Sequence, residues 1–128
     1  MTRRVSDVTP AQHDATMARD EGRCVRGGDL VRGHRGVDFS TQHRVARGMG
    51  GSRHAARPSA LILLCGSATT GCHGWVEAHP AEARELGYRV PPGTDPGTWP
   101  VLYHGREWRQ LTDDGWQTPA GEDTTPWP

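Results

Sequence analysis

The sequence predicts a small α+β protein made of one domain with tails, and three observations support this. Two strand-like runs, VDFSTQH at 37–43 and SALILL at 59–64, flank a glycine-rich segment. Two short helical segments follow between residues 72 and 87, with a proline between them and a glycine at the end. Further along, two more strand-like runs surround His104 and Gly105.

Composition limits the core and the class of protein. Of 128 residues, 34% are hydrophobic and 6% aromatic, with 17 glycines and 10 prolines, so a metal or a partner is expected to support a small core. There is no apolar run of about 18 residues, which predicts no membrane span. The N-terminus, MTRRVSDVTP, lacks an apolar signal-peptide core, so we expect a cytoplasmic protein.

Charge is unevenly distributed along the chain. Residues 1–58 carry eleven arginines against six acidic residues, and residues 59–128 carry four against nine. All fifteen basic residues are arginine, whose guanidinium binds phosphate bidentately and suits a nucleic-acid surface. A GC-rich coding sequence explains the absence of lysine equally well.

The N-terminal residues 1–20 are polar, lack sustained periodicity and contain Pro10, which predicts a flexible arm with a helical turn around 11–19. The main domain is expected at 21–90. In it, residues 37–43 alternate as a half-buried strand that ends at His43, and residues 59–64 form a buried antiparallel partner. Between them, RVARGMGGSR offers a flexible backbone and three cations, Arg44, Arg47 and Arg53, which favour a polyanion.

Helices are predicted at 72–79 and 80–87, because Pro80 cannot continue the first helix and is suited to begin the second. Residues 91–116 are expected to form a C-terminal extension with a hairpin of strands 100–103 and 107–111, followed by a turn at 113–115. Residues 117–128 are predicted to be disordered.

The order of these elements resembles that of the HNH endonuclease family. It is a strand ending in histidine, a glycine-rich loop, a second strand, and a helix that begins with Cys72 and His73. The likeness is greatest to its small bacteriophage-encoded members and spans about residues 24 to 87. The resemblance implies a ββα-metal (His-Me finger) core and a hydrolase that cleaves DNA phosphodiester bonds. It also implies a link to phage genome packaging and a location in the host-cell cytoplasm.

The resemblance assigns His43 as the general base, a role that suits imidazole because it titrates near neutral pH. It places a catalytic Mg²⁺ or Mn²⁺ on the helix through His73, with Gln42 beside the base as a further ligand. For the second helix ligand, Glu77 is only about 40° from His73 on the helical wheel, whereas His79 is about 120° away. Glu77 is therefore preferred.

The family also suggests a structural Zn²⁺. Cys24 matches the first position of its Cys-x-x-Cys knuckle, Gly27 stands where the second cysteine is expected, and Cys65 and Cys72 resemble the second pair. A fourth ligand would be water or a histidine such as His34; alternatively, the knuckle has lost its metal.

Two further interpretations stay open. Ala60 occupies the position of a family asparagine that fixes the loop carrying the catalytic histidine, so the chain could be a degenerate HNH-like module that binds DNA or a protein without cleaving. Alternatively, His73 joins Cys24, Cys65 and Cys72 in a closed Cys₃His zinc site of a structural or interaction protein.

Overall fold

The structure is a computed structural model that describes residues 8–45, 57–115 and 117–119. This part of the chain contains three α-helices and two small sheets, which confirms the predicted α+β class. Most of the glycine-rich segment, with Arg47 and Arg53, and the tail from residue 120 onward lie outside the described residues.

The first sheet is an antiparallel pair of strands, β1 (Phe39–His43) and β2 (Leu61–Cys65), and its register places His43 opposite Leu61. The predicted antiparallel pairing is confirmed, although both strands begin two residues later than expected. Residues 36–38 form a turn in which the Asp38 amide donates to the His34 carbonyl. Pro58 begins a 3-10 turn, η1 (Pro58–Ala60), which delays the start of β2.

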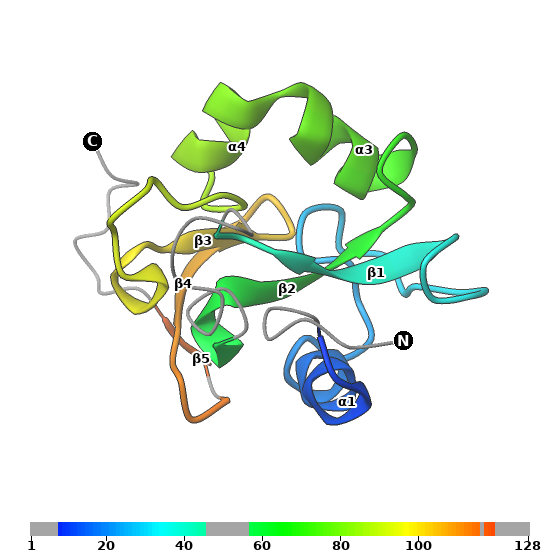
Figure 1. Cartoon of the computed structure of the whole chain (residues 1–128), viewed down its shortest axis with the longest axis horizontal. Helices are drawn as coiled ribbons and strands as arrows, with labels where there is room; N and C mark the ends of the chain where they lie inside the picture. The colour runs from blue at the N-terminus through cyan, green and yellow to red at the C-terminus, as the bar shows by residue number, and fades with distance from the viewer. Residues whose placement is uncertain (1–7, 46–56, 116, 120–128) are drawn as a thin grey trace, which may run out of the picture.

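Two helices, α3 (Gly71–Ala78) and α4 (Pro80–Glu85), cover one face of this strand pair (Figure 1). They agree with the prediction to within two residues. Pro80 lies at the first turn of α4, and Gly87 follows the helix with φ of +87°. A Cβ at Gly87 would lie 2.0 Å from the Pro100 carbonyl oxygen, so only glycine allows the chain to pass this close to the next segment.

The predicted C-terminal hairpin is formed by β3 (Val101–Tyr103) and β4 (Glu107–Leu111), which pair antiparallel. A short 3-10 turn, η2 (Pro96–Thr98), precedes it. The prediction of disorder from residue 117 is wrong at its start, because β5 (Gln117–Pro119) pairs with β4 as a third strand. The Gln117 side chain also accepts a hydrogen bond from Arg109 (2.8 Å), which holds the strand in register.

The N-terminal arm is also corrected. The helical turn predicted around 11–19 is a full helix, α1 (Pro10–Arg19), which Pro10 begins rather than interrupts. Thr9 and Gln12 form a reciprocal capping box at its start. α1 lies beneath the face of the strand pair opposite α3 (Figure 1). Its buried residues are polar: His13 hydrogen-bonds Thr41 at 2.5 Å, and Arg19 donates to the Leu61 carbonyl at 2.5 Å.

One hydrophobic core joins β2, α3, α4 and the hairpin. Its fully buried members include Ile62, Leu64, Val76, Val101 and Leu111. Cys24 and Cys72 belong to the same cluster and Cys65 packs against it, so the predicted zinc ligands lie at the core. Among the described residues, no helix is long and apolar enough to cross a membrane.

Candidate metal centres

The predicted metal ligands Gln42, His73 and Glu77 lie together where β1 faces α3. The Gln42 amide donates to the Glu77 carboxylate at 3.2 Å, and His73 Nε2 lies 3.6 Å from the same carboxylate oxygen. The four-residue spacing places His73 and Glu77 on one helix face, as expected. The other ring nitrogen, Nδ1, is 3.1 Å from Ser40 Oγ. Because Ser40 and Gln42 are two residues apart in β1, they share the face of the strand turned toward α3.

The electrostatics of this cluster favour a neutral histidine. Burial lowers the pKa of His73, Glu77 opposes this effect, and Arg89 adds to it. A neutral imidazole retains a lone pair for a metal. The Glu77 carboxylate also pairs with Arg89 at 2.8 Å, so a cation already lies beside the expected metal ligand.

His43 is the last residue of β1, directly after Gln42. Side chains alternate along a strand, so His43 belongs to the face of Phe39 and Thr41, and Gln42 to the opposite face. The expected base and the expected ligands therefore meet only at the end of β1. A phosphate that contacts both would have to lie across this strand end.

Arg44 is the clearest correction to the predicted site. It was expected to bind a DNA phosphate, but it is 1% exposed and its guanidinium donates to backbone carbonyls. These acceptors are Gly87 (2.7 Å), Ser59 (2.6 Å), Pro96 (3.1 Å) and Trp99 (2.5 Å). Burial lowers the pKa of Arg44 to about 9, so the group still carries its charge at pH 7. A side chain held in this way is not free to bind DNA.

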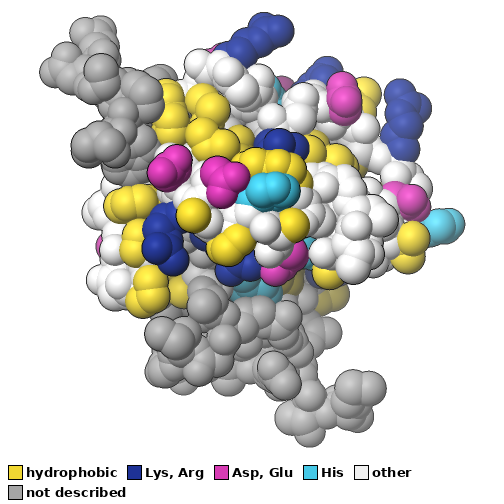
Figure 2. All heavy atoms as spheres, turned by 90° about the horizontal axis from the view of Figure 1, so that it is seen from above, with side chains coloured by type: hydrophobic (Ala, Val, Ile, Leu, Met, Phe, Trp, Pro, Cys, Tyr) yellow, Lys and Arg dark blue, Asp and Glu magenta, His cyan; other side chains and the backbone are white. Residues whose placement is uncertain are grey.

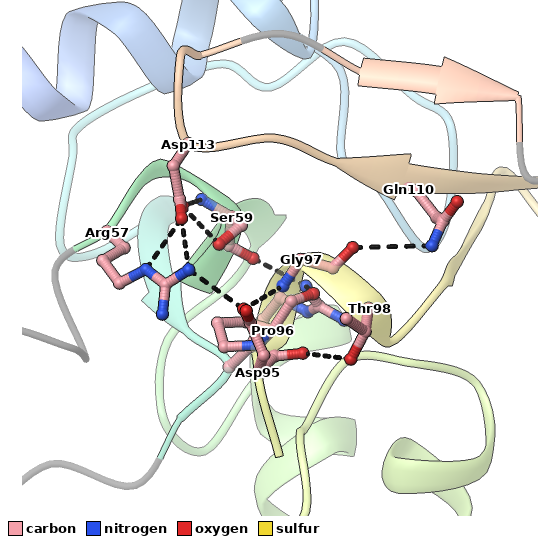
Figure 3. A network of polar contacts seen from close by, with 9 residues as sticks. Arg57, Ser59, Asp95, Pro96, Gly97, Thr98, Gln110 and Asp113 are labelled. Atoms are coloured by element: carbon pink, nitrogen blue, oxygen red, sulfur yellow. Dashed lines mark hydrogen bonds and ion pairs between the residues drawn. The ribbon is translucent and has the colours of Figure 1, made fainter.

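Arg57, at the far end of the glycine-rich segment, is also anchored (Figure 3). Its guanidinium forms ion pairs with Asp95, at 2.9 Å, and with Asp113. Asp113 also accepts a hydrogen bond from the Ser59 hydroxyl at 2.5 Å. Partial burial disfavours ionisation of Asp113, but the hydrogen bonds from Arg57 and Ser59 outweigh it and lower the pKa. The chain is thus fixed on both sides of residues 46–56.

Ala60 is fully buried and has no polar side chain to take the place of the asparagine that the HNH resemblance implies here. Its backbone nevertheless holds the chain just after His43, because the Arg44 amide donates to the Ala60 carbonyl at 2.7 Å. Together with the Arg44 guanidinium bond to the Ser59 carbonyl, this contact ties the end of β1 to η1.

Three thiols form a second cluster at the start of α3. The Sγ atoms of Cys24, Cys65 and Cys72 all lie within 4.8 Å of one another. Cys65 ends β2, Cys72 is in the first turn of α3, and Cys24 lies in the loop after α1. Thiolates are preferred zinc ligands, and these three residues could hold such an ion.

Local hydrogen bonds favour negative charge on this cluster. The Gly27 amide lies 3.4 Å from Cys24 Sγ, the Cys72 amide 3.4 Å from Cys65 Sγ, and Arg26 Nη1 3.4 Å from Cys72 Sγ. The hydrogen bond from Cys24 lowers the pKa of Cys72 to about 5, and Arg26 acts in the same direction against burial. The same contact and burial raise the pKa of Cys24, so the pair retains one proton at neutral pH.

The histidines considered as a fourth zinc ligand do not join the thiols. Within the described ranges, no histidine or carboxylate atom lies within 4.8 Å of all three sulfurs. His73 instead faces Ser40 and Glu77. The closed Cys₃His arrangement is therefore not formed.

Three neighbours of these clusters were not predicted from the sequence: Ser40, Arg26 and Arg89. Ser40 could have been found from strand alternation, since it shares a face with Gln42. Arg26 lies between Cys24 and Gly27 but is drawn to the cluster by stacking on Trp75 (3.9 Å). Arg89 reaches Glu77 only because the chain turns back after α4.

Figure 2 shows the face that carries α3 and α4, on which acidic, basic, histidine and hydrophobic side chains are interspersed. Among the side chains described on this face, no single sign of charge dominates. No protein-family model, curated protein or solved structure matches the chain.

Proposed function

We propose that this protein is a metal-dependent HNH endonuclease that hydrolyses DNA phosphodiester bonds. The observation that carries the proposal is the cluster of Gln42, His73 and Glu77 between β1 and α3. His43 follows Gln42 directly in the chain, at the end of β1. An antiparallel strand pair followed by a helix that contributes to this cluster is an arrangement that a ββα-metal core would require, and it supports the proposal.

In this proposal His43 accepts a proton from the attacking water. His73, Glu77 and the Gln42 amide oxygen would hold Mg²⁺ or Mn²⁺. Bound there, the ion would supply positive charge to stabilise the charge developing on the phosphate and on the departing 3′ oxygen. The donor set fits the ion, because it offers a carboxylate, an amide oxygen and a neutral imidazole. Arg89 would transfer from Glu77 to the substrate phosphate when the ion binds.

The family asparagine that Ala60 replaces would not be required if the fold holds His43 by another route. Contacts from Arg44 to the carbonyls of Ser59 and Ala60 provide such a route. Because Arg44 is committed to this role, contacts to DNA would come from Arg47 and Arg53. A structural Zn²⁺ bound by the three cysteines would support the small core. A link to phage packaging proteins in the host-cell cytoplasm follows from the family resemblance alone.

One observation favours a second function, an HNH-like module that binds DNA or a protein without cleaving. The ion pair of Arg89 with Glu77 already neutralises the only carboxylate of the proposed ligand set. If this pair persists in solution, the site binds phosphate through Arg89 and holds no divalent ion. Binding to DNA would then fall steeply with added salt.

The experiment is nicking of supercoiled plasmid by the full chain in Mg²⁺ or Mn²⁺, with EDTA as the metal-free control. Wild type is expected to nick, and His43→Ala is expected to lower the rate by about a hundredfold or more. His34→Ala, which changes an exposed histidine, is the matched control and should retain the wild-type rate. Folded wild-type protein that fails to nick in either metal, but still binds DNA, would favour the second function.

A further inference from the structure

The cysteine cluster has a ligand position that Gly27 leaves vacant. Gly27 is three residues after Cys24, where a Cys-x-x-Cys knuckle would have its second thiol. A Cβ built on Gly27 would lie 3.5 Å from Cys72 Sγ and 3.8 Å from Cys24 Sγ, so a side chain here would begin at the cluster. The cluster therefore has the shape of a four-ligand site with one protein ligand removed.

This position opens toward solvent. Gly27 is exposed and Cys65 is half-buried, whereas Cys24 is fully buried behind them. Gly28 has φ of +86°, but the backbone at Gly27 is outside the left-handed region, so it accepts other residues. Because these distances from a Cβ at residue 27 are ordinary van der Waals contacts, a side chain can be added there without rearrangement.

The charge of the site suits a small donor from solution. Three thiolates and a divalent ion carry a net charge of −1, and the Arg26 guanidinium lies 3.4 Å from Cys72 Sγ. Stacking on Trp75 holds Arg26 in this place. The arginine offsets the negative charge, so a neutral imidazole or an anionic thiolate can both be accommodated as fourth ligand.

We propose that the cluster binds a thiophilic divalent metal through three protein thiolates and takes its fourth ligand, a small thiol or an imidazole, from solution at the Gly27 side. The inference rests on the metal site of the proposed function and is independent of DNA hydrolysis.

The test is Co²⁺ binding to the full chain, kept reduced with a phosphine and followed by visible and near-ultraviolet absorption. Tetrahedral cobalt gives ligand-field bands that shift when a ligand changes, and its sulfur charge-transfer absorption grows with the number of thiolates. In wild type, 2-mercaptoethanol and imidazole should each shift the ligand-field bands, and 2-mercaptoethanol should raise the charge-transfer absorption.

Two substitutions at residue 27 separate the possibilities. Gly27→Cys should raise the charge-transfer absorption without added thiol and abolish the response to 2-mercaptoethanol. Gly27→Ala is the matched control, since it adds the Cβ without a donor, and it should retain the three-thiolate spectrum and the response.

The proposal is overturned if wild type binds no Co²⁺ or if added ligands leave its spectrum unchanged. It is also overturned if the spectrum without added ligand changes in His34→Ala, His54→Ala or His104→Ala, because the fourth ligand would then belong to the protein. Cobalt binding with the expected shifts in a protein that does not nick DNA would retain this inference and remove the nuclease.

Discussion

Arg44 holds together three backbone segments that are distant in sequence. Its guanidinium donates to carbonyls of the turn after α4, of η1, and of η2 together with Trp99, the residue that follows it. Hydrogen bonds to a charged group each contribute about 1.5–3 kcal/mol, and a carbonyl left without its donor in the interior is costly. The same side chain fixes the backbone next to His43, which links stability to the candidate site.

We predict that Arg44→Ala lowers the free energy of unfolding by about 3–5 kcal/mol, measured by urea denaturation. Arg44→Lys should recover little of this loss, since an ammonium cannot reach four acceptors arranged around a planar fork. Arg32→Ala, at an exposed arginine, should stay within about 0.5 kcal/mol of wild type. A small effect of Arg44→Ala would contradict the anchoring role.

The sequence could not separate Arg44 from Arg47 and Arg53. All three are arginines in one glycine-rich segment, and this pattern favours polyanion binding whichever of them is buried. The four carbonyl acceptors of Arg44 come from residues 15 to 55 positions away, so no local pattern reveals them.

At the scale of elements, α1 shows why a segment without apolar periodicity can still be part of the fold. It buries polar groups, and its end is held by a buried network: Arg19 and Asp20 pair at 3.0 Å, and the Tyr103 hydroxyl donates to Asp20 at 2.6 Å. Asp20 also accepts the Leu63 amide at 3.2 Å. This carboxylate thus joins α1, β2 and β3.

Removing that carboxylate should undo the attachment of α1. We predict that Asp20→Ala costs about 3–5 kcal/mol of unfolding free energy, because it leaves the buried Arg19 without the carboxylate that balances its charge. Asp14→Ala, at an exposed position of α1, is the control and should cost less than about 0.5 kcal/mol. Limited proteolysis of the Asp20→Ala chain should then cleave within residues 10–19. Wild-type resistance in this variant would show that α1 is held by other contacts.

The elements that were predicted correctly have local signals. Pro80 and Gly87 delimit α4. The alternation of apolar and polar residues predicts β1, and the apolar run at 59–64 predicts β2. The Thr9–Gln12 capping box was also present in the sequence, but α1 buries His13, Thr16 and Arg19, so its apolar pattern is missing. β5 is short and polar, and its place depends on pairing with β4.

At the scale of the whole molecule, α3 contributes to two clusters of different chemistry. Cys72 belongs to the soft thiol cluster, and the next residue, His73, faces the oxygen-rich cluster with Glu77. The four-residue spacing of His73 and Glu77 on α3 made the oxygen-rich cluster predictable. The three cysteines in the sequence made the thiol cluster predictable. Arg89, which competes for Glu77, could not be anticipated, because its position depends on how the chain returns after α4.

Three histidines that are distributed over the molecule should make stability depend on pH. Burial is the largest cause that lowers the pKa values of His13, His73 and His104 below 6.5. Below pH 6.5 the unfolded chain therefore binds protons that the folded chain does not, and folding stability falls as the pH falls through the folded-state pKa values.

Denaturation in urea between pH 7 and pH 5 checks this prediction, and the free energy of unfolding should decrease steadily on acidification. Replacement of His13 by Gln should reduce the slope by removing one of the three groups. Asp113 has its pKa lowered from 3.8 and contributes to a separate loss at lower pH. Stability that is constant or rises from pH 7 to pH 5 would contradict the assignment of these histidines as neutral in the folded protein.

The most direct measurement of the central claim is Mn²⁺-dependent nicking of supercoiled plasmid by Glu77→Gln beside wild type. Glu77 is the carboxylate of the proposed metal ligand set, whereas Glu82, exposed in α4, provides the matched control Glu82→Gln. We predict metal-dependent nicking by wild type and Glu82→Gln, and a loss of about a hundredfold or more in Glu77→Gln. Equal nicking by all three proteins, or none by folded wild type, would contradict a catalytic metal at Gln42, His73 and Glu77.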